Sequence, residues 1–149
     1  MYIKLYIRVI ETMFCSARGC YHHPKVYDLA RATCMSEAFP NKSAYLTDEY
    51  DKRTVKLDVN AQGYVSNLKY FVEKGEFGTA EDSKGNVYIA DGEIYVYDAQ
   101  GKLLKEIKTP ERPTSVVISN DDKILYITVP DHYIIEIYSK IRCEISFEY

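Results

Sequence analysis

The sequence predicts an all-β fold of β-propeller-type blades, and three observations support this. Short apolar runs alternate with turn signals over most of the chain, as expected for many short strands. The chain has 15 tyrosines and no tryptophan, and tyrosine suits the half-buried surface of a pleated strand. Related segments also recur after about 40 residues, which is the length of a four-stranded blade.

We expect residues 1–37 to form a divergent N-terminal segment and residues 38–149 to form a partial propeller domain. Within the first part, residues 2–10 alternate apolar and polar side chains with a period of two, which predicts a strand. Residues 24–37 start at Pro24 and continue with apolar residues at helical spacing, which predicts the only helix of the chain.

From residue 38 onward, nine short apolar runs predict strands. They are residues 44–48, 53–59, 67–72, 86–91, 93–98, 102–108, 114–119, 124–129 and 133–139. The segments between them contain Gly, Asn or Asp, which form tight turns. Residues 141–149 alternate once more and predict a final strand that pairs with residues 2–10 or with a partner.

A repeat organises these strands. The segments AYLTD, VYIAD and LYITV place equivalent tyrosines at Tyr45, Tyr88 and Tyr126, spaced by 43 and 38 residues. Two AQG turns, which begin at Ala61 and Ala99, are also 38 residues apart. The agreement of two markers favours a propeller over the alternative, a β-sandwich with chance similarity.

The number of predicted blades is too small for a closed ring. Residues 38–149 hold two and a half to three blades, whereas closed propellers have about four to eight. Blade faces and strand edges therefore stay open, and we expect either self-association through open blade edges or a chain that is part of a longer propeller.

Composition excludes several classes of partner. The chain carries 19 basic and 22 acidic residues, so nucleic acid is not an expected partner. No apolar run approaches the roughly 18 residues that span a membrane, and charged residues interrupt the apolar N-terminus, which argues against a signal peptide. The four cysteines form no CxxC pair, so we expect reduced thiols and a cytoplasmic location.

The segments that follow resemble one known family. They are AFPNKSAYLTDEYDKRTVKLDVNAQGYVSN (38–67), GEFGTAEDSKGNVYIADGEIYVYDAQGKLLKEI (75–107), PERPTSVVI (110–118) and KILYIT (123–128). Together, residues 38–138 resemble the C-terminal half of the gluconolactonase, regucalcin (senescence marker protein) and luciferin-regenerating-enzyme family. The join between two blades at residues 110–114 is the most distinctive part.

The resemblance implies a six-bladed propeller that binds one divalent metal, usually calcium, at the mouth of its tunnel. It also implies hydrolysis of sugar-acid lactones and related esters. The family's metal ligands are a glutamate, an asparagine and an aspartate. In this chain the glutamate has no counterpart, the asparagine position falls near Met35, and the aspartate position is Phe77. Neither side chain can bind calcium, so we expect no metal ligands of the family type here.

Three charged residues lie next to these positions and are the candidate catalytic residues. Glu37 and Glu76 adjoin the two replaced ligands, and Arg112 precedes the next inner strand. The alternative interpretation is that all three are solvated charges at strand ends. We therefore expect a gluconolactonase-like lactone hydrolase, active only if a partner chain or these glutamates complete the site. The alternative is a non-catalytic binding or self-associating propeller fragment.

Other candidate sites are less specific. A cluster of cysteines and histidines could bind zinc, although its spacing does not match known zinc sites, and incidental thiols are the alternative. Its members are Cys15, Cys20, His22, His23 and Cys34. His132 falls in a predicted turn and is expected to be a surface residue. Four tyrosines could form a stacking platform for sugars or bases, but their strand spacing favours packing between blades. They are Tyr88, Tyr95, Tyr97 and Tyr126.

Overall fold

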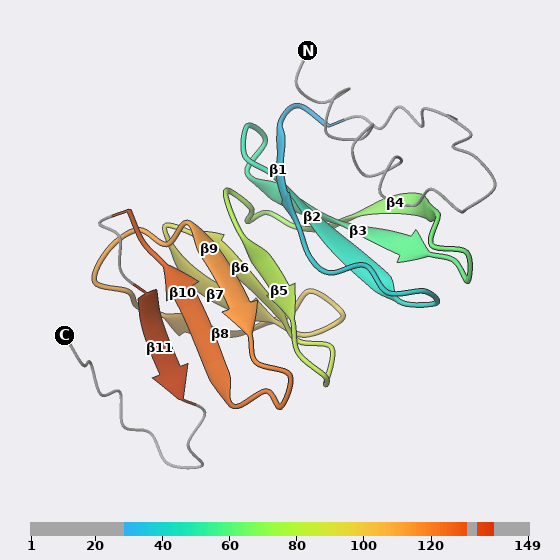
Figure 1. The fold of residues 1–149 in the computed structure, drawn as a ribbon. Helices are drawn as coiled ribbons and strands as arrows, with labels where there is room; N and C mark the ends of the chain where they lie inside the picture. The colour runs from blue at the N-terminus through green and yellow to red at the C-terminus, as the bar shows by residue number, and fades with distance from the viewer. Residues whose placement is uncertain (1–28, 131–133, 139–149) are drawn as a thin grey trace.

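The computed structural model describes residues 29–130 and 134–138, and within them it contains strands but no helix. The strands form three antiparallel sheets, each a meander in which neighbours in the chain are neighbours in the sheet (Figure 1). The first sheet holds β1 (Ala32–Met35), β2 (Ser43–Asp48), β3 (Arg53–Val59) and β4 (Val65–Val72). The second holds β5 (Thr79–Glu81), β6 (Val87–Asp91), β7 (Glu93–Tyr97) and β8 (Leu103–Ile107). The third holds β9 (Ser115–Ile118), β10 (Ile124–Thr128) and β11 (Ile134–Tyr138).

The two AQG turns have the same structure. Each joins the third and fourth strands of a sheet, and each begins with a residue whose side chain closes the turn. The side-chain oxygens of Asn60 and Asp98 accept hydrogen bonds at 2.9–3.0 Å from the amides two and four residues later. Gly63 and Gly101 end the two turns at φ of 86° and 83°, a left-handed conformation that glycine adopts without steric cost.

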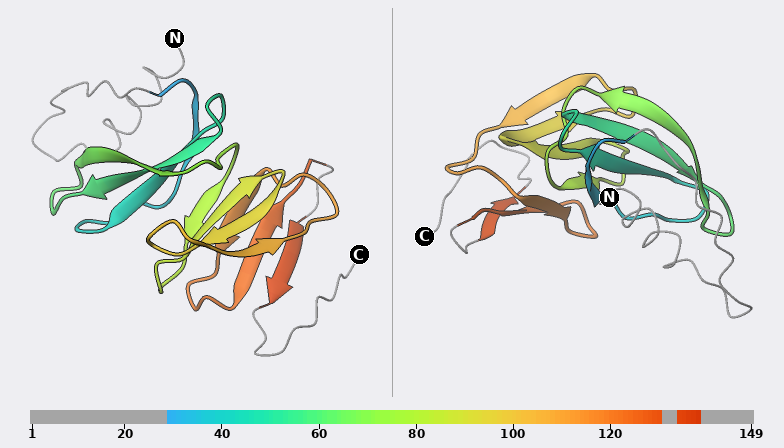
Figure 2. Two further views of the ribbon diagram at one scale, coloured as in Figure 1. Left: turned by 180° about the vertical axis from the view of Figure 1, so that it is seen from behind. Right: turned by 90° about the horizontal axis from the view of Figure 1, so that it is seen from above.

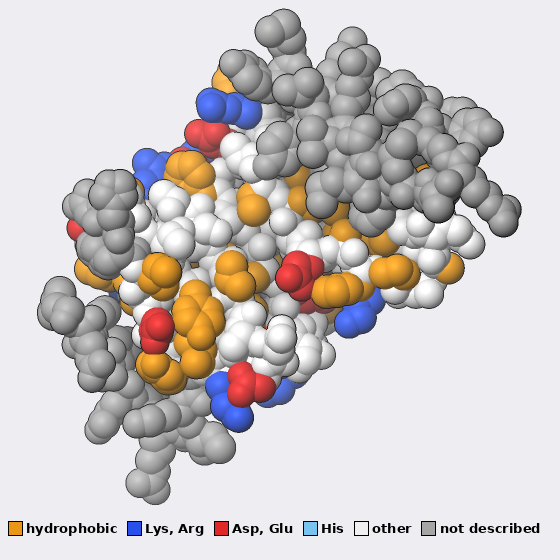
Figure 3. Space-filling model, in the orientation of Figure 1, with side chains coloured by type: hydrophobic (Ala, Val, Ile, Leu, Met, Phe, Trp, Pro, Cys, Tyr) orange, Lys and Arg blue, Asp and Glu red, His pale blue; other side chains and the backbone are white. Residues whose placement is uncertain are grey.

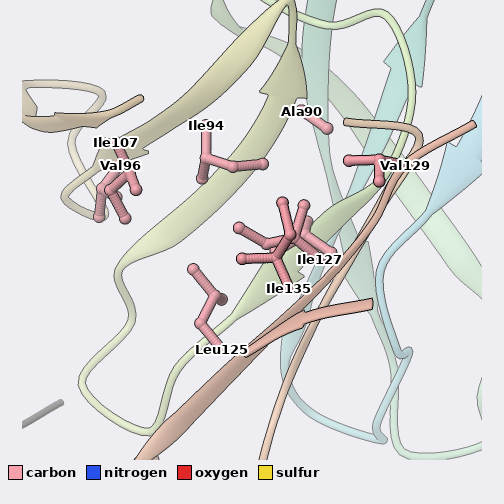
Figure 4. Close-up of a cluster of buried hydrophobic side chains, with 9 residues drawn as sticks. Ala90, Ile94, Val96, Ile107, Leu125, Ile127, Val129 and Ile135 are labelled. Carbon is pink, nitrogen blue, oxygen red and sulfur yellow. The ribbon is translucent and has the colours of Figure 1, made fainter. Parts of the chain in front are cut away.

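Apolar side chains fill the two spaces between the sheets. Tyr45 of the first sheet packs with Val87, Ile89 and Tyr97 of the second. The other face of the second sheet packs against the third through a larger cluster, shown in Figure 4. Its buried members are Ala90, Ile94, Val96, Ile107, Val116, Leu125, Ile127, Val129 and Ile135. Each sheet thus stabilises the next by burying apolar area.

The three sheets form an open arc in the described part of the chain. The second sheet lies between the other two, and the first and third do not close into a ring (Figures 1 and 2). The all-β, propeller-type fold predicted from the sequence is confirmed. Tyr88, Tyr95 and Tyr97 pack between sheets, which confirms the packing interpretation for them.

The helix predicted over residues 24–37 is wrong wherever the structure describes it. Residues 32–35 form β1, which pairs with β2 in the first sheet. Its extended start is fixed by the Asp48 carboxylate, which accepts hydrogen bonds from the backbone amides of Ala30 and Arg31 at 2.9 Å and 2.8 Å. These long-range contacts outweigh a local helical spacing.

Some predictions lie outside the described residues. These are the strands at 2–10 and 141–149, His132, and the Cys/His cluster except Cys34, which is a free thiol. Among the residues that the structure describes, no helix is long and apolar enough to cross a membrane.

Candidate functional site

The candidate site is built around the connection from β4 to β5, which contains Gly75, Glu76, Phe77 and Gly78. Both glycines are required by close backbone approaches. A Cβ atom at Gly75 would lie 2.3 Å from the carbonyl oxygen of Arg53, and one at Gly78 would lie 2.7 Å from the Cα of Ser115. The connection is therefore held tightly between the first and third sheets.

Hydrogen bonds fix the backbone on both sides of Glu76. The hydroxyl of Thr33 donates to the Glu76 carbonyl oxygen at 2.8 Å, and the hydroxyl of Thr47 donates to the Phe77 carbonyl oxygen at 2.6 Å. The amide of Phe77 donates to the Ala90 carbonyl oxygen at 3.0 Å. Because these partners belong to the first and second sheets, Glu76 has a defined position at their junction.

The Glu76 carboxylate binds two cationic side chains. Arg112 donates from Nε to Oε2 at 3.0 Å and from Nη2 to Oε1, and Lys52 donates from Nζ to the same Oε1. Only 4% of the Glu76 side chain is exposed, whereas Arg112 and Lys52 are 57% and 52% exposed. Lys52 lies in the β2–β3 turn and Arg112 in the β8–β9 connection. One buried carboxylate therefore joins segments from all three sheets.

The charges in this cluster act on one another. Burial alone would raise the pKa of Glu76, but hydrogen bonds from Arg112 and Lys52, together with their positive charges, outweigh it and lower the pKa from its ordinary value. The hydrogen bond to Glu76 in turn raises the pKa of Arg112. Glu76 is thus ionised near neutral pH, and the three side chains leave one net positive charge facing solvent.

Local geometry aims the two cations at Glu76. Lys52 has a φ of 52°, a left-handed conformation that is uncommon for lysine and that turns its side chain toward the carboxylate. The Arg112 guanidinium lies over the Phe77 ring, 5.6 Å from its centroid, which adds a cation–π contact to the ion pair.

The structure brings together two of the three predicted site residues. Glu76 and Arg112 are in contact, whereas Glu37 is exposed in the connection after β1. The Glu76 carbonyl contacts Thr33, and four further residues of extended chain carry the backbone about 13 Å to Glu37. Sequence reasoning missed Lys52, because nothing in a DEYDKR turn indicates which side chain it turns inward.

The described residues do not fit the calcium ion that the family resemblance implies. Met35 packs against the apolar cluster on the far face of the first sheet, and Phe77 packs against the core between the second and third sheets. Both oxygens of Glu76 already accept hydrogen bonds from cations. No group of three or more His, Cys, Asp or Glu side chains among the described residues could hold a metal ion.

The fold and this cluster define an open array of propeller blades, in which the Glu76 carboxylate links the blades through Lys52 and Arg112. The chain belongs to the SMP-30/gluconolactonase/LRE-like family, whose model matches residues 29–130. This confirms the resemblance found in the sequence. A comparison with curated protein sequences found no match.

Solved structures share the fold at low sequence identity. A gluconolactonase from Xanthomonas campestris is 18% identical over 71% of this chain, with a TM-score of 0.58. A luciferin-regenerating enzyme is 23% identical over 68% of the chain, with a TM-score of 0.57. A calcium-binding regucalcin from Agrobacterium tumefaciens is 18% identical over 68%, with a TM-score of 0.56. The matches span only 37%, 38% and 38% of those three proteins.

Proposed function

We propose that the protein is a lactone hydrolase of the gluconolactonase type, acting on sugar-acid lactones and related esters. Family membership supports this, and one of the solved relatives is a gluconolactonase. The observation that carries the proposal is the state of Arg112. Its guanidinium is held by the buried Glu76 carboxylate and yet is more than half exposed, so it can also bind a substrate.

Hydrolysis adds water to the lactone carbonyl carbon and breaks the ring C–O bond, which yields a carboxylate, a hydroxyl group and a proton. Negative charge develops on the carbonyl oxygen during the addition, and positioned donors stabilise it. Arginine carries five N–H donors, and the pair with Glu76 uses two of those of Arg112. In this proposal its other donors and the Lys52 ammonium bind the carbonyl oxygen.

Glu76 acts here as a positioning residue. Its oxygens are engaged by Arg112 and Lys52, so it fixes the cations, and the proton of the attacking water passes to solvent. The resemblance implies a calcium ion, and the regucalcin relative is described as calcium-binding. Because the described residues do not fit that ion, we assign charge stabilisation to Arg112 and Lys52. The cytoplasmic location expected from the cysteines remains part of the proposal.

Hydrolysis of gluconolactone by the purified full chain tests this function. We compare the wild type with Arg112→Ala, and use Arg31→Ala as a matched control, because Arg31 is also an exposed arginine paired with a glutamate, Glu49. We expect Arg112→Ala to lower the rate at least tenfold, within the range known for loss of one transition-state donor. The Arg31→Ala control should hydrolyse gluconolactone at the wild-type rate. A chelator should leave the rate of the wild type unchanged.

Two results would contradict parts of the proposal. A wild-type rate no higher than that of Arg112→Ala would overturn hydrolysis at this site, and gluconate binding that depends on Arg112 would then favour the non-catalytic alternative. Loss of activity with chelator, restored by calcium, would show that a metal takes part and that its ligands lie outside the described residues.

A further inference from the structure

The outer face of the third sheet is equivalent to a face that forms an interface elsewhere in the chain. In the second sheet, Ala80, Tyr88 and Val96 lie side by side across three strands, and this row packs against the third sheet. In the third sheet the strand register places Val117, Tyr126 and Glu136 in the corresponding row. The repeat tyrosine thus marks the interface side of each sheet.

The first sheet follows the same rule. Tyr45, the repeat tyrosine of β2, is fully buried against the second sheet. Tyr88 of β6 is partly buried against the core shared with the third sheet. Only Tyr126 of β10 lies on a face that no described strand covers. That face is therefore equivalent to two faces that form interfaces within the chain, where each packs on the opposite face of the next sheet.

The free face is apolar and open. Val117, Ile134 and Tyr138 lie on it with exposures of 56%, 61% and 52%. Hydrophobic side chains gather over β9, β10 and β11 in Figure 3. The carboxylate on this face, Glu136, accepts a hydrogen bond from the Tyr138 hydroxyl at 2.6 Å. Contiguous exposed apolar residues of this kind mark interaction surfaces.

The other sheet faces of the described chain are already buried. The second sheet packs on both sides, and the far face of the first sheet is covered, because Leu46, Val55 and Leu57 are at most 2% exposed. Among the described residues, a second copy therefore offers one open apolar sheet face, which is that of its own third sheet. Two copies that meet through the same face form a closed two-fold dimer.

We propose that the free face of β9, β10 and β11 is a self-association surface, on which the third sheet of a second copy packs. This inference does not depend on lactone hydrolysis. The face is three strands wide, and a standard interface buries roughly 800 Å² per partner. We therefore expect a weak dimer that depends on concentration.

Sedimentation equilibrium of the full chain over about 5–200 µM, the range in which a weak dimer would associate, tests the proposal. The wild-type mass should rise from 17.2 kDa toward twice that value and stop there. Val117→Asp and Ile134→Asp should each weaken association at least tenfold, because each buries a charge in the interface. Leu104→Asp on β8 is the matched control, since Leu104 is 51% exposed on the second sheet.

Circular dichroism identifies the variants that keep the fold. Because the two substitutions lie on different strands, the test still works if one of the variants fails to fold. A wild type that stays at 17.2 kDa throughout would overturn the proposal. Equal weakening by Leu104→Asp, or growth beyond two copies, would also overturn it. The last result would indicate a head-to-tail contact in place of a two-fold one.

Discussion

The Arg112 guanidinium binds both carboxylate oxygens of Glu76, although the two residues are 36 positions apart and lie in different connections between sheets. The pair links the start of the second sheet to the start of the third. Lys52, from the first sheet, completes the contact. The cluster is therefore both the candidate binding site and a link between blades.

Replacing Glu76 should destabilise the fold. Glu76→Gln removes the buried negative charge and leaves two cations close together. Because both cations are more than half exposed, water screens part of the loss, and we expect about 1–2 kcal/mol of unfolding free energy. Urea unfolding measures this value. Glu37→Gln, at an exposed glutamate, should change it by less than about 0.5 kcal/mol, and equal effects of the two substitutions would contradict the structural role of Glu76.

The same carboxylate should make stability depend on pH. The pKa of Glu76 is lowered in the folded state, so the unfolded state takes up its proton first as the pH falls. The stabilisation is therefore complete above the unfolded pKa of about 4.3 and is lost as the pH falls through the lower folded value. Urea unfolding of the wild type and Glu76→Gln across that range tests this. Their difference should shrink toward low pH, and a constant difference would refute the assignment.

The left-handed backbone conformation of Lys52 allows a separate test of the β2–β3 turn. Lys52→Ala loses the ion pair and keeps the unfavourable backbone conformation, whereas Lys52→Gly loses the ion pair but relieves the backbone. We expect the glycine variant to be more stable than the alanine variant by about 1 kcal/mol. Thermal or urea unfolding of the pair gives the value. The reverse order would mean that Lys52 does not adopt this conformation in solution.

A methyl group at Gly78 should separate the second and third sheets. The added Cβ would meet the backbone of β9 at 2.7 Å, and a backbone atom cannot rotate away. We expect Gly78→Ala to cost about 1–3 kcal/mol of unfolding free energy. Gly92→Ala is the comparison, because nothing lies within 4 Å of its Cβ and only its φ of 75° opposes the change. It should cost about 1 kcal/mol, and a larger loss there than at Gly78 would contradict this packing.

Residues that act through their immediate neighbours in the chain could be predicted from the sequence. The Asn60 and Asp98 turns and the tyrosines at Tyr45 and Tyr88 gave the blade period, because their roles depend on local turn geometry and on strand alternation. The helix over residues 24–37 failed for the opposite reason. Its segment is held as β1 by the Asp48 carboxylate and by pairing with β2, and neither contact is visible in a local window.

The candidate site shows the same division. Glu76 was selected because it adjoins a replaced ligand position, and Arg112 because it precedes a predicted inner strand. The structure places the two in contact. Lys52 could not be selected, because its role depends on one backbone angle in a turn. Glu37 was also selected because it adjoins a replaced ligand position. It follows the C-terminal end of β1, whereas Glu76 contacts Thr33 near the start of that strand. An extended strand separates residues that are only a few positions apart in the sequence.

The meander order of each sheet affects how the number of blades can change during evolution. Within residues 29–130 and 134–138, every backbone ladder joins strands that follow one another in the chain, and none crosses from one sheet to the next. Loss or duplication of a whole blade therefore breaks no hydrogen-bonded pair of strands. It alters only the side-chain faces between blades, and contacts within a blade can form early in folding because they are local. The number of blades is thus a property that evolution can vary in single steps.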